Sequence, residues 1–397
     1  MHSYATPIHV VRASQPDLPV WCFRPERVTA AAKWFRDSFS AEPFYAVKAN
    51  PAEHVLDALW AGGVRSFDCA SDTEVELIRT RFPEARIAFL HPVKNRRAIA
   101  RAYKEFGVRI FVTDTMTELN KILEETGYAT DLTIIVRVAV SCDGAALPLA
   151  GKFGAGADDA AEILREARRY ADELGVSFHV GSQAMQPTAW ATAMADVSRI
   201  IITAGVTVDI VDVGGGFPSI YADNAPPSLD AYAAMVEASF ENMFVLENAE
   251  LWCEPGRALC AESESLLCRI ELAKDGALYI NDGSYGALYD AVHERWNFPK
   301  RAIAGDGRKL HGMTAYTVYG PTCDSTDKFP EEIMLPAGLA EGDYIEFGNL
   351  GAYGRAMSSR FNGFGQTEVV EVQDAPWPTL YGSIGAEVVS IGSMATR

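Results

Sequence analysis

The chain lacks the features that mark several common classes of protein. None of its seven cysteines stands in a CxxC or His-rich arrangement, so the sequence predicts neither a zinc site nor a disulfide framework. No apolar run approaches the ~18 residues that a membrane-spanning helix requires, and no basic and apolar leader opens the chain. We therefore expect a cytoplasmic protein with no bound metal.

Positive charge is also scarce. Lys and Arg number 35 against 53 Asp and Glu, which gives a formal net charge of −18. Binding to nucleic acid or to an anionic membrane requires clustered Lys and Arg, so neither is expected as a partner. An acidic surface favours the approach of a cationic small molecule, although it also serves solubility alone.

What the chain does contain is a repeated alternation of short apolar runs and helical patterns. Segments between the runs, such as 72–82 and 158–174, have acidic first turns and apolar residues at helical spacing. Strands that alternate with helices pair in parallel, and eight such units fit a (β/α)8 TIM-like barrel better than an open sheet. The eight runs are residues 44–49, 64–70, 86–91, 108–114, 132–140, 176–182, 208–213 and 250–254.

The pattern changes after about residue 258. Stretches separated by Gly and Pro turns there read as strands, namely 264–272, 277–282, 344–347 and 366–372. "PIHVV" and "VWCF", within the first 25 residues, read as strands too. Because 397 residues exceed the ~250–300 at which single cores stop growing, we expect two domains. Residues 26–258 would form the α/β barrel, and residues 1–25 with 259–397 a mostly β domain.

The run at residues 44–50, "FYAVKAN", ends on a lysine. Lysine is rarely buried without a partner, so Lys48 is either a surface residue at the end of a strand or a group with a chemical task. A lysine nitrogen at this place can act as the nucleophile toward a carbonyl cofactor. Taken alone, these seven residues favour the interpretation of Lys48 as a surface residue.

Polar residues recur where the predicted strands end, which is the face that carries catalytic groups in such barrels. "DVGGGF" puts Gly215 and Gly216 after the seventh run, and "EPGR" puts Gly256 and Arg257 after the eighth. Glycine N–H groups and a guanidinium suit a phosphate. The spacing is not that of nucleotide loops, so a small phosphorylated cofactor is favoured. The other strand-end residues are Lys48, Asp68, His91, Asp114, Arg137, His179 and Glu254.

A lysine, a phosphate site and a carboxylate at a strand end are what pyridoxal 5'-phosphate requires. Lys48 can link to the cofactor, and Glu254 can keep the pyridine nitrogen protonated. His179 offers a flat ring for stacking, although a lone histidine is as often a hydrogen-bonded structural residue.

Eight motifs then make the chain similar to a known family, the eukaryotic-type ornithine decarboxylases. These belong to the fold-type III pyridoxal-phosphate enzymes, with diaminopimelate decarboxylase and, more distantly, alanine racemase. The resemblance runs from about residue 20 to 365 and implies a barrel with an alanine-racemase-like β domain. The motifs, in family order, are "YAVKAN", "FDCAS", "HVGSQ", "DVGGGFP", "EPGR", "NDGSYGALYD", "GPTCDSTD" and "GAYG".

The resemblance implies a role for each matching residue. Lys48 is similar to the Schiff-base lysine, His179 to the histidine stacked on the pyridine ring, and Glu254 to the partner of the ring nitrogen. Asp68 and Arg137 resemble the pair beside the cofactor. The residues that resemble phosphate contacts are Ser182, Gly215, Gly216, Gly256, Arg257 and Tyr353.

The resemblance also implies a shared active site in a head-to-tail homodimer. Cys323 looks like the cysteine that acts late in the reaction, and Asp290 and Asp324 look like the acids that receive the distal amino group. Tyr289, next to Asp290, is expected beside the substrate. In the family the counterparts of Cys323 and Asp324 reach in from the partner subunit, and Lys152 with Asp327 looks like an interface salt bridge.

The substrate expected from these residues is a basic L-amino acid. Diaminopimelate decarboxylases have an Arg before "ALYD", whereas no Arg lies between Asn281 and Asp290, so a distal carboxylate would be left unpaired. L-ornithine, giving putrescine in polyamine biosynthesis, is the first choice. Lysine stays open because one methylene changes binding by only ~1–3 kcal/mol.

Two alternatives of other kinds also stand beside a decarboxylase. A regulatory homologue without cofactor would not need Lys48, Glu254, Arg257 and Cys323 together, and a racemase would need a Tyr that we cannot assign. The chain departs from the family pattern at two positions. Gln183 stands where many relatives have Gly, and Gly354 stands where eukaryotic relatives have Thr.

Overall fold

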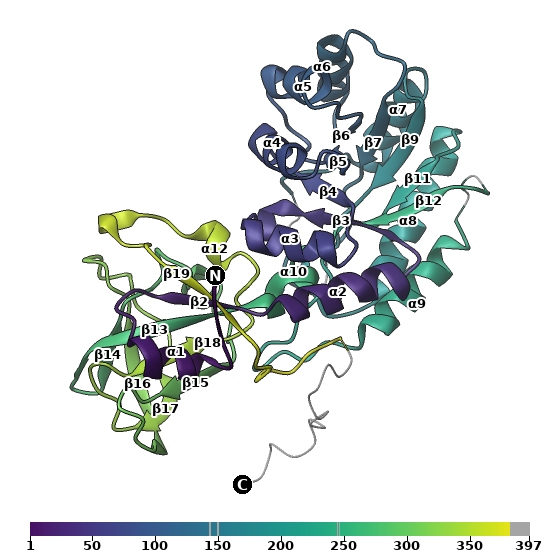
Figure 1. Cartoon of the computed structure of the whole chain (residues 1–397). Helices are drawn as coiled ribbons and strands as arrows, with labels where there is room; N and C mark the ends of the chain where they lie inside the picture. Colours follow the sequence, from purple (N-terminus) through teal and green to yellow (C-terminus); the bar gives the residue numbers. More distant parts are fainter. Residues whose placement is uncertain (143, 149–150, 244, 246, 382–397) are drawn as a thin grey trace.

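The predicted barrel is confirmed by the computed structural model, which describes residues 1–142, 144–148, 151–243, 245 and 247–381. Eight parallel strands close into a barrel in the order β11-β12-β3-β4-β5-β6-β7-β9 (Figure 1). Their bounds are β3 Glu42–Ala46, β4 Ser66–Cys69, β5 Arg86–Phe89, β6 Ile110–Thr113, β7 Thr133–Arg137, β9 Glu173–Ser177, β11 Ile210–Asp212 and β12 Glu250–Cys253.

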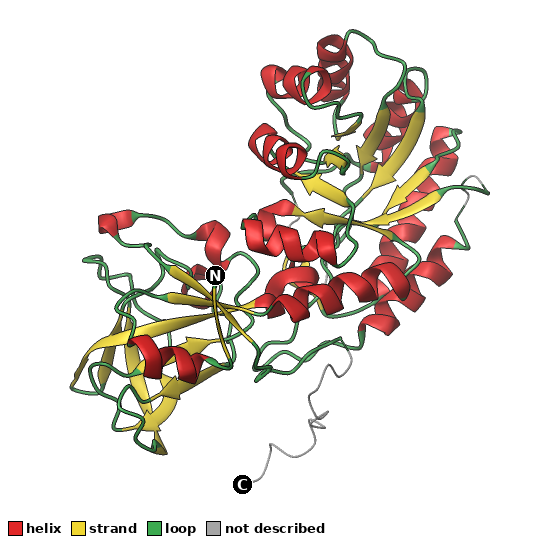
Figure 2. Cartoon of the chain, in the orientation of Figure 1, coloured by secondary structure: helices red, strands yellow, loops and turns green. Residues whose placement is uncertain are grey.

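Helices cover the outside of the barrel (Figure 2). Several begin at side chains that accept a hydrogen bond from a free N–H group of the first turn, such as Ser71 from Glu74 and Thr115 from Glu118. None of the described helices is long and apolar enough to cross a membrane. The helices are α2 Pro25–Asp37, α3 Glu53–Ala61, α4 Asp72–Arg81, α5 Arg96–Lys104, α6 Met116–Thr126, α7 Ala157–Ala167, α8 Thr188–Ala204 and α9 Leu229–Phe240.

Alternate residues of the barrel strands face two separate cores. Tyr45 packs in the large cluster shared with the helices, while its neighbour Phe44 belongs to a smaller cluster with Ile135 and Trp252. The rings of Phe44 and Trp252 lie 4.5 Å apart, and the guanidinium of Arg86 lies over Trp252. The smaller cluster fills the inside of the barrel and leaves only the carboxyl ends of the strands open for a cavity.

The second sheet has nine strands and combines the first and the last strand of the described chain. The order along its main path is β1-β19-β2-β13-β14-β16-β17, and β18 joins β13 to β15. This sheet confirms the predicted mostly β part of the fold. Its strands are β1 His2–Tyr4, β2 Val20–Phe23, β13 Glu264–Lys274, β14 Ala277–Ile280, β15 Lys300–Ile303, β16 His311–Tyr319, β17 Ile333–Ala337, β18 Tyr344–Phe347 and β19 Glu368–Val372.

One predicted strand is wrong. "PIHVV" lies in helix α1, Pro7–Ser14, and not in a strand. Pro7 stands in the first helical turn, where its fixed φ angle and missing N–H group cost nothing. Pro7, Val10 and Val11 are buried on one side of α1, a spacing of three and four residues that the short β-branched run concealed. "VWCF" is strand β2, as expected.

The sixth barrel unit also differs from the prediction. The helix expected over 158–174 ends at Ala167, and β9 covers residues 173–177 where a strand was expected over 176–182. Just after the helix ends, the Asp209 carboxylate accepts from Arg168 at 2.7 Å and from the backbone N–H of Leu174 at 2.8 Å. These contacts hold the turn between helix and strand, and they join residues that are distant in the sequence.

Candidate active site

A cavity of about 470 Å³ opens at the carboxyl ends of the barrel strands. Ten of the residues predicted to hold a cofactor line it, and they come from five barrel strand ends, the β10 hairpin strand Ser182–Ala184 and the second domain. Asp68, the remaining predicted cofactor residue, does not line the cavity but contacts Lys48, which does. The ten residues are Lys48, Arg137, His179, Ser182, Gly215, Gly216, Glu254, Gly256, Arg257 and Tyr353.

Lys48 lies in a single 3-10 turn, Val47–Ala49, directly after β3. Its Nζ is 3.1 Å from Oδ2 of Asp68, and its side chain is 45% exposed because it faces the open cavity. Burial of its surroundings acts to lower the pKa of Lys48, but the nearby carboxylates of Asp68 and Glu254 outweigh burial and raise this pKa above its usual value. In this structure Lys48 is therefore a charged ammonium paired with Asp68.

The turn that carries Lys48 is held by both domains. Asn50 donates from Nδ2 to the carbonyl of Gly351 at 2.7 Å and to Glu264 at 2.8 Å. The N–H group of Tyr353 donates to the carbonyl of Ala49 at 2.7 Å. Lys48 and Tyr353 therefore keep a fixed relation to each other across the two domains.

Three buried carboxylates lie at neighbouring strand ends around Lys48. They are Asp68 on β4, Asp212 on β11 and Glu254 after β12. Burial raises the pKa of Glu254, and the charges of Asp212 and Asp68 raise it further. Burial also raises the pKa of Asp212. One oxygen of Asp212 accepts from the N–H of Gly214, while buried oxygens of Asp68 and Asp212 have no hydrogen-bond partner among the described residues.

His179 follows β9 and presents a neutral ring to the cavity. Its Nδ1 accepts a hydrogen bond from the N–H of Gly181 at 3.0 Å, which leaves the proton of the neutral ring on Nε2. Burial, followed by the charges of Arg137 and Lys48, lowers the pKa of His179 to about 3. The imidazole is thus uncharged at neutral pH and can lie against a flat aromatic ring.

The glycine loops leave room for a ligand close to the backbone. Gly216 has a φ of +102°, and a Cβ atom there would lie 2.4 Å from the carbonyl oxygen of Gly181. A Cβ atom on Gly215 would lie 3.1 Å from Nε2 of His179. A side chain at Gly215 would therefore crowd the His179 ring, and one at Gly216 would push the loop away from Gly181.

Arg257 is fixed on three sides at the edge of the same cavity. Its guanidinium lies 3.8 Å from the ring centre of Trp296 and 4.9 Å from that of Tyr353, and it donates to the hydroxyl of Tyr221 at 2.8 Å. Its buried Nε has no partner among the described residues. A rigid guanidinium with a free donor beside a glycine cradle fits a phosphate group.

The predicted substrate residues lie outside the set that lines the cavity. Tyr289 and Asp290 begin helix α11, Tyr289–His293, and Oδ2 of Asp290 is 4.0 Å from Arg257. Cys323 is exposed and Asp324 is half-buried on the loop between β16 and β17. The hydroxyl of Tyr285 donates to Asp324 at 2.6 Å.

The predicted pair of Lys152 and Asp327 is not formed within the described part of this chain. Lys152 lines the cavity. The Asp327 carboxylate is buried and accepts hydrogen bonds from Ser284 and Thr322 of the same domain. A salt bridge to Lys152 of another subunit would have to compete with these bonds.

Sequence reasoning missed three residues that shape the site. Asp212 was visible only as the residue before the glycine run, and its burial beside Glu254 was not foreseen. Tyr221 and Trp296 contact Arg257 although they lie 36 and 39 positions from it in the sequence (257 − 221 and 296 − 257). No local pattern marks such contacts, because they depend on how the loops of the two domains meet.

Comparisons with known proteins show which family the chain resembles. Residues 26–261 match the pyridoxal binding domain of pyridoxal-dependent decarboxylases. The decarboxylase flvG of Aspergillus flavus is 34% identical over 363 residues, covering 86% of this chain and 82% of that protein. An ornithine decarboxylase of Panagrellus redivivus is 31% identical over 357 residues, covering 84% and 80%. A structure of lysine/ornithine decarboxylase from Vibrio vulnificus complexed with cadaverine has a TM-score of 0.80 at 26% identity, covering 94% and 100%.

The barrel, its cavity and these matches define a pyridoxal-phosphate-dependent amino-acid decarboxylase. The chain belongs to the ornithine and arginine decarboxylase family of fold type III. The predicted cofactor, pyridoxal phosphate, is confirmed by the same matches. The residues present fit it, since the glycine cradle and the free Nε of Arg257 suit its phosphate and the unpartnered carboxylate oxygens suit its polar ring atoms.

Proposed function

We propose that this enzyme converts L-ornithine to putrescine and carbon dioxide, with L-lysine to cadaverine as the alternative activity. The observation that carries the proposal is the chemistry expected at the far end of the substrate. No Arg lies between Asn281 and Asp290, and two acids, Asp290 and Asp324, are available there for an ammonium group.

Lys48, Glu254 and His179 would each act at a different part of the cofactor. Pyridoxal phosphate, when bound, provides the electron sink for the carbanion left by loss of carbon dioxide. Lys48 supplies the amine to which a carbonyl cofactor links. Glu254 holds a proton at the ring nitrogen, and the neutral His179 packs on the ring without adding a charge.

The remaining cavity residues would hold the phosphate and the polar edge of the ring. Gly215, Gly216 and Gly256 offer backbone donors, while Arg257 supplies a guanidinium whose position is fixed by Trp296 and Tyr221. Ser182 and Tyr353 line the same region. Asp68, with Arg137 nearby, keeps Lys48 oriented through the 3.1 Å contact.

Loss of carbon dioxide leaves a position at the alpha carbon that needs a proton. We propose that the thiol of Cys323 delivers it. Because Cys323 is exposed on the second domain and does not line the cavity of its own chain, the proposal requires a homodimer in which Cys323 and Asp324 come from the partner subunit.

The two acids differ in how they could receive an ammonium group. The hydrogen bond from Tyr285, followed by those from Thr326, lowers the pKa of Asp324, so this carboxylate stays ionised. Burial raises the pKa of Asp290, and the charge of Arg257 opposes that rise. We therefore propose Asp324 as the main partner of the distal ammonium and Asp290 as a second acceptor.

A non-catalytic regulatory role is less well supported. Such a chain would have no need for a lysine paired with Asp68, a buried Glu254 and a free Arg257 donor in one cavity. Diaminopimelate is disfavoured as substrate. Its distal carboxylate would lie beside the acids Asp290 and Asp324, and the segment 281–290 supplies no Arg to pair with it.

The proposal is tested by separating the distal contact from the chemistry. Asp324→Ala should raise KM for L-ornithine by about tenfold or more, as expected for loss of a charged hydrogen bond, and should change much less the weak turnover of L-norvaline, which has no distal ammonium. Asp306→Ala, at an exposed acid elsewhere in the domain, is the control. Equal losses with both substrates would overturn the assigned role of Asp324.

A further inference from the structure

The last described segment of the chain, residues 373–381, runs from the second domain to the barrel (Figure 1). We call it the C-terminal strap. It follows β19 and has no strand or helix of its own. It is held instead by contacts with both domains, at three places along its length.

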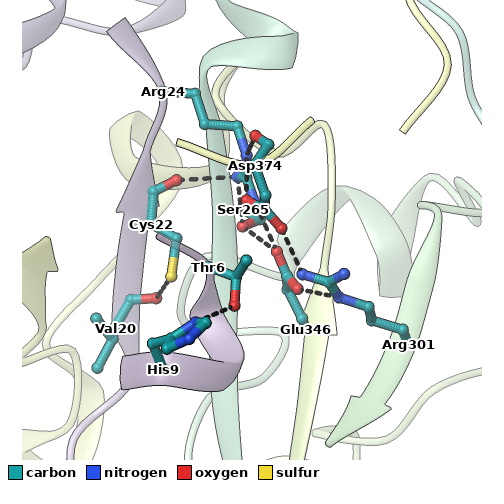
Figure 3. A network of polar contacts seen from close by, with 9 residues as sticks. All are labelled: Thr6, His9, Val20, Cys22, Arg24, Ser265, Arg301, Glu346 and Asp374. Carbon is teal, nitrogen blue, oxygen red and sulfur yellow. Dashed lines mark hydrogen bonds and ion pairs between the residues drawn. The ribbon is translucent and has the colours of Figure 1, made fainter. Parts of the chain in front are cut away.

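The first of these places is a buried ion cluster in the second domain (Figure 3). Asp374 accepts from Arg24 and from Arg301, each at 2.8 Å. The same two arginines also bind Glu346, which is completely buried. Each acid is therefore shared by both guanidinium groups, and the start of the strap is fixed to strands that carry no part of the cavity.

The second place is Trp377, in the middle of the strap. Its ring lies so close to Gly348 that a Cβ atom on this glycine would be 2.2 Å from the indole nitrogen. The guanidinium of Arg301 lies 5.6 Å from the centre of the same ring. Trp377 thus brings the strap close to the second domain just before it reaches the barrel.

The third place lies on the barrel side, next to residues that line the cavity. The N–H of Leu380 donates to buried Glu262 at 3.2 Å, and the hydroxyl of Tyr381 donates to the carbonyl of Ala258 at 2.5 Å. Tyr381 is only 4% exposed and belongs to the barrel core. Thr379 holds Tyr381 in place, because its hydroxyl accepts from the N–H of Tyr381 at 3.1 Å.

Ala258 lies in α10, Arg257–Cys260, a helix of four residues. The last four carbonyls of any helix lack partners inside it, so a helix this short depends on groups outside it for hydrogen bonds. The carbonyl of Ala258 is buried and takes its hydrogen bond from Tyr381. The residue before it is Arg257, and Gly256 precedes the helix.

We propose that Tyr381 is a positioning residue for the cofactor phosphate, and that the C-terminal strap acts on the cavity through α10. Tyr381 does not line the cavity, but its hydroxyl fixes the backbone from which Gly256 and Arg257 face it. The inference rests on the proposed phosphate site at these two residues. Without the hydroxyl, the buried Ala258 carbonyl loses its partner and the start of α10 loosens.

The test measures binding of the cofactor with and without its phosphate. Apoprotein is titrated with pyridoxal phosphate and with pyridoxal, and visible absorbance reports the Kd of each. Tyr381→Phe should raise the Kd of pyridoxal phosphate about three- to tenfold and that of pyridoxal by less than about twofold, the range expected for one buried hydrogen bond. Tyr128→Phe, at an exposed tyrosine on the barrel, should leave both unchanged.

Two outcomes would overturn the proposal. If Tyr381→Phe weakened both compounds equally, Tyr381 would be only a structural residue, and if it weakened neither, the strap would not reach the phosphate. Arg257→Met separates this inference from the site on which it rests. Unchanged binding of pyridoxal phosphate by Arg257→Met would instead mean that the proposed phosphate site is wrong.

A second variant covers the case in which Tyr381→Phe does not fold. Thr379→Val keeps the shape of the side chain but removes the hydroxyl that holds the Tyr381 backbone. It should change the two Kd values in the same direction as Tyr381→Phe, by a smaller factor. An unchanged ratio of the two Kd values in this folded variant would contradict the proposal.

Discussion

The charges around Lys48 explain why a lysine ends an otherwise apolar run. Asp68 pairs with its ammonium, and the carboxylate of Glu254 also acts to raise the pKa of Lys48. These acids hold Lys48 in its charged form. A lysine nucleophile must lose its proton before it reacts with a carbonyl, so the proposed link to the cofactor requires that Lys48 give up this proton. A carbonyl cofactor that links to Lys48 replaces the free ammonium.

Replacing Lys48 should therefore remove the covalent link to the cofactor. Lys48→Ala is expected to show no visible absorbance band from linked pyridoxal phosphate and no turnover, because among the described residues no other lysine beside the cavity pairs with Asp68. Absorbance spectra and amine release measure the two effects. Lys104→Ala, at an exposed lysine, is the control, and a retained band in Lys48→Ala would contradict the assignment.

The pKa of Asp282 leads to a prediction about how stability depends on pH. Burial raises the pKa of Asp282 to about 7, against ~3.9 in an unfolded chain. A raised pKa means that the folded state binds the proton more tightly, so stability falls as pH rises from about 4 to about 7 and stays reduced above that. Asp282→Asn, which keeps an oxygen for the N–H of Ala287, removes this loss.

Thermal unfolding should show the difference directly. The Tm of Asp282→Asn minus that of the natural chain should grow between about pH 4 and about pH 7 and then level off. The corresponding difference in the free energy of unfolding is at most about 4 kcal/mol for a three-unit shift in pKa. Asp275→Asn is the control, because Asp275 is exposed in a turn of the same domain. A Tm difference independent of pH would show that Asp282 does not titrate in this way.

At the scale of elements, strands were easier to predict than their ends. The eight barrel runs were visible because buried parallel strands are continuously apolar. The early end of α7 was not visible, because the turn that follows it is held by Asp209 from a distant part of the chain. The helix α1 was missed because Val10 and Val11 have the residue type of a strand and the spacing of a helix.

The candidate site could also be predicted only in part from the sequence. Lys48, Glu254 and Arg257 stood at the ends of predicted strands, where a barrel collects its polar groups. Trp296 and Tyr221, which hold Arg257, come from loops that no strand pattern places. Tyr381 could not be found from sequence, because its role depends on the path of the strap.

The glycine loop after β11 can be tested by one added methyl group. Gly216→Ala should raise the Kd of pyridoxal phosphate by about tenfold or more, since strain at positive φ and a clash with the Gly181 carbonyl together cost over ~1.4 kcal/mol. Gly205→Ala is the matched control, because Gly205 also has a positive φ of +65° but no atom within 4 Å of an added Cβ. Equal effects on cofactor binding would contradict the role of the cradle.

At the scale of the whole molecule, one chain does not bring all the proposed groups together. Cys323 and Asp324 lie outside the cavity that contains Lys48, so the proposed chemistry needs two subunits. Loss of Lys48 and loss of Cys323 should then complement each other in mixed dimers. An intact site would combine Lys48 of one subunit with Cys323 of the other.

Mixing two inactive variants tests this arrangement. Equal amounts of Lys48→Ala and Cys323→Ala, dissociated and reassembled, should regain about a quarter of full activity, because half of the dimers are mixed and each has one intact site. Lys48→Ala mixed with His179→Ala is the control and should regain none, since both changes affect the same subunit's half of the site. No recovery in the first mixture would mean that the sites are not shared.

The most direct test of the account is product analysis with the purified protein and pyridoxal phosphate. L-ornithine, L-lysine, L-arginine and meso-diaminopimelate are supplied in competition, and carbon dioxide and each amine are measured. The account predicts putrescine as the main product, with one carbon dioxide released per amine. Cadaverine as the main product would keep the chemistry and change the preferred substrate. Lysine formed from diaminopimelate, or no carbon dioxide from any of the four, would contradict the account.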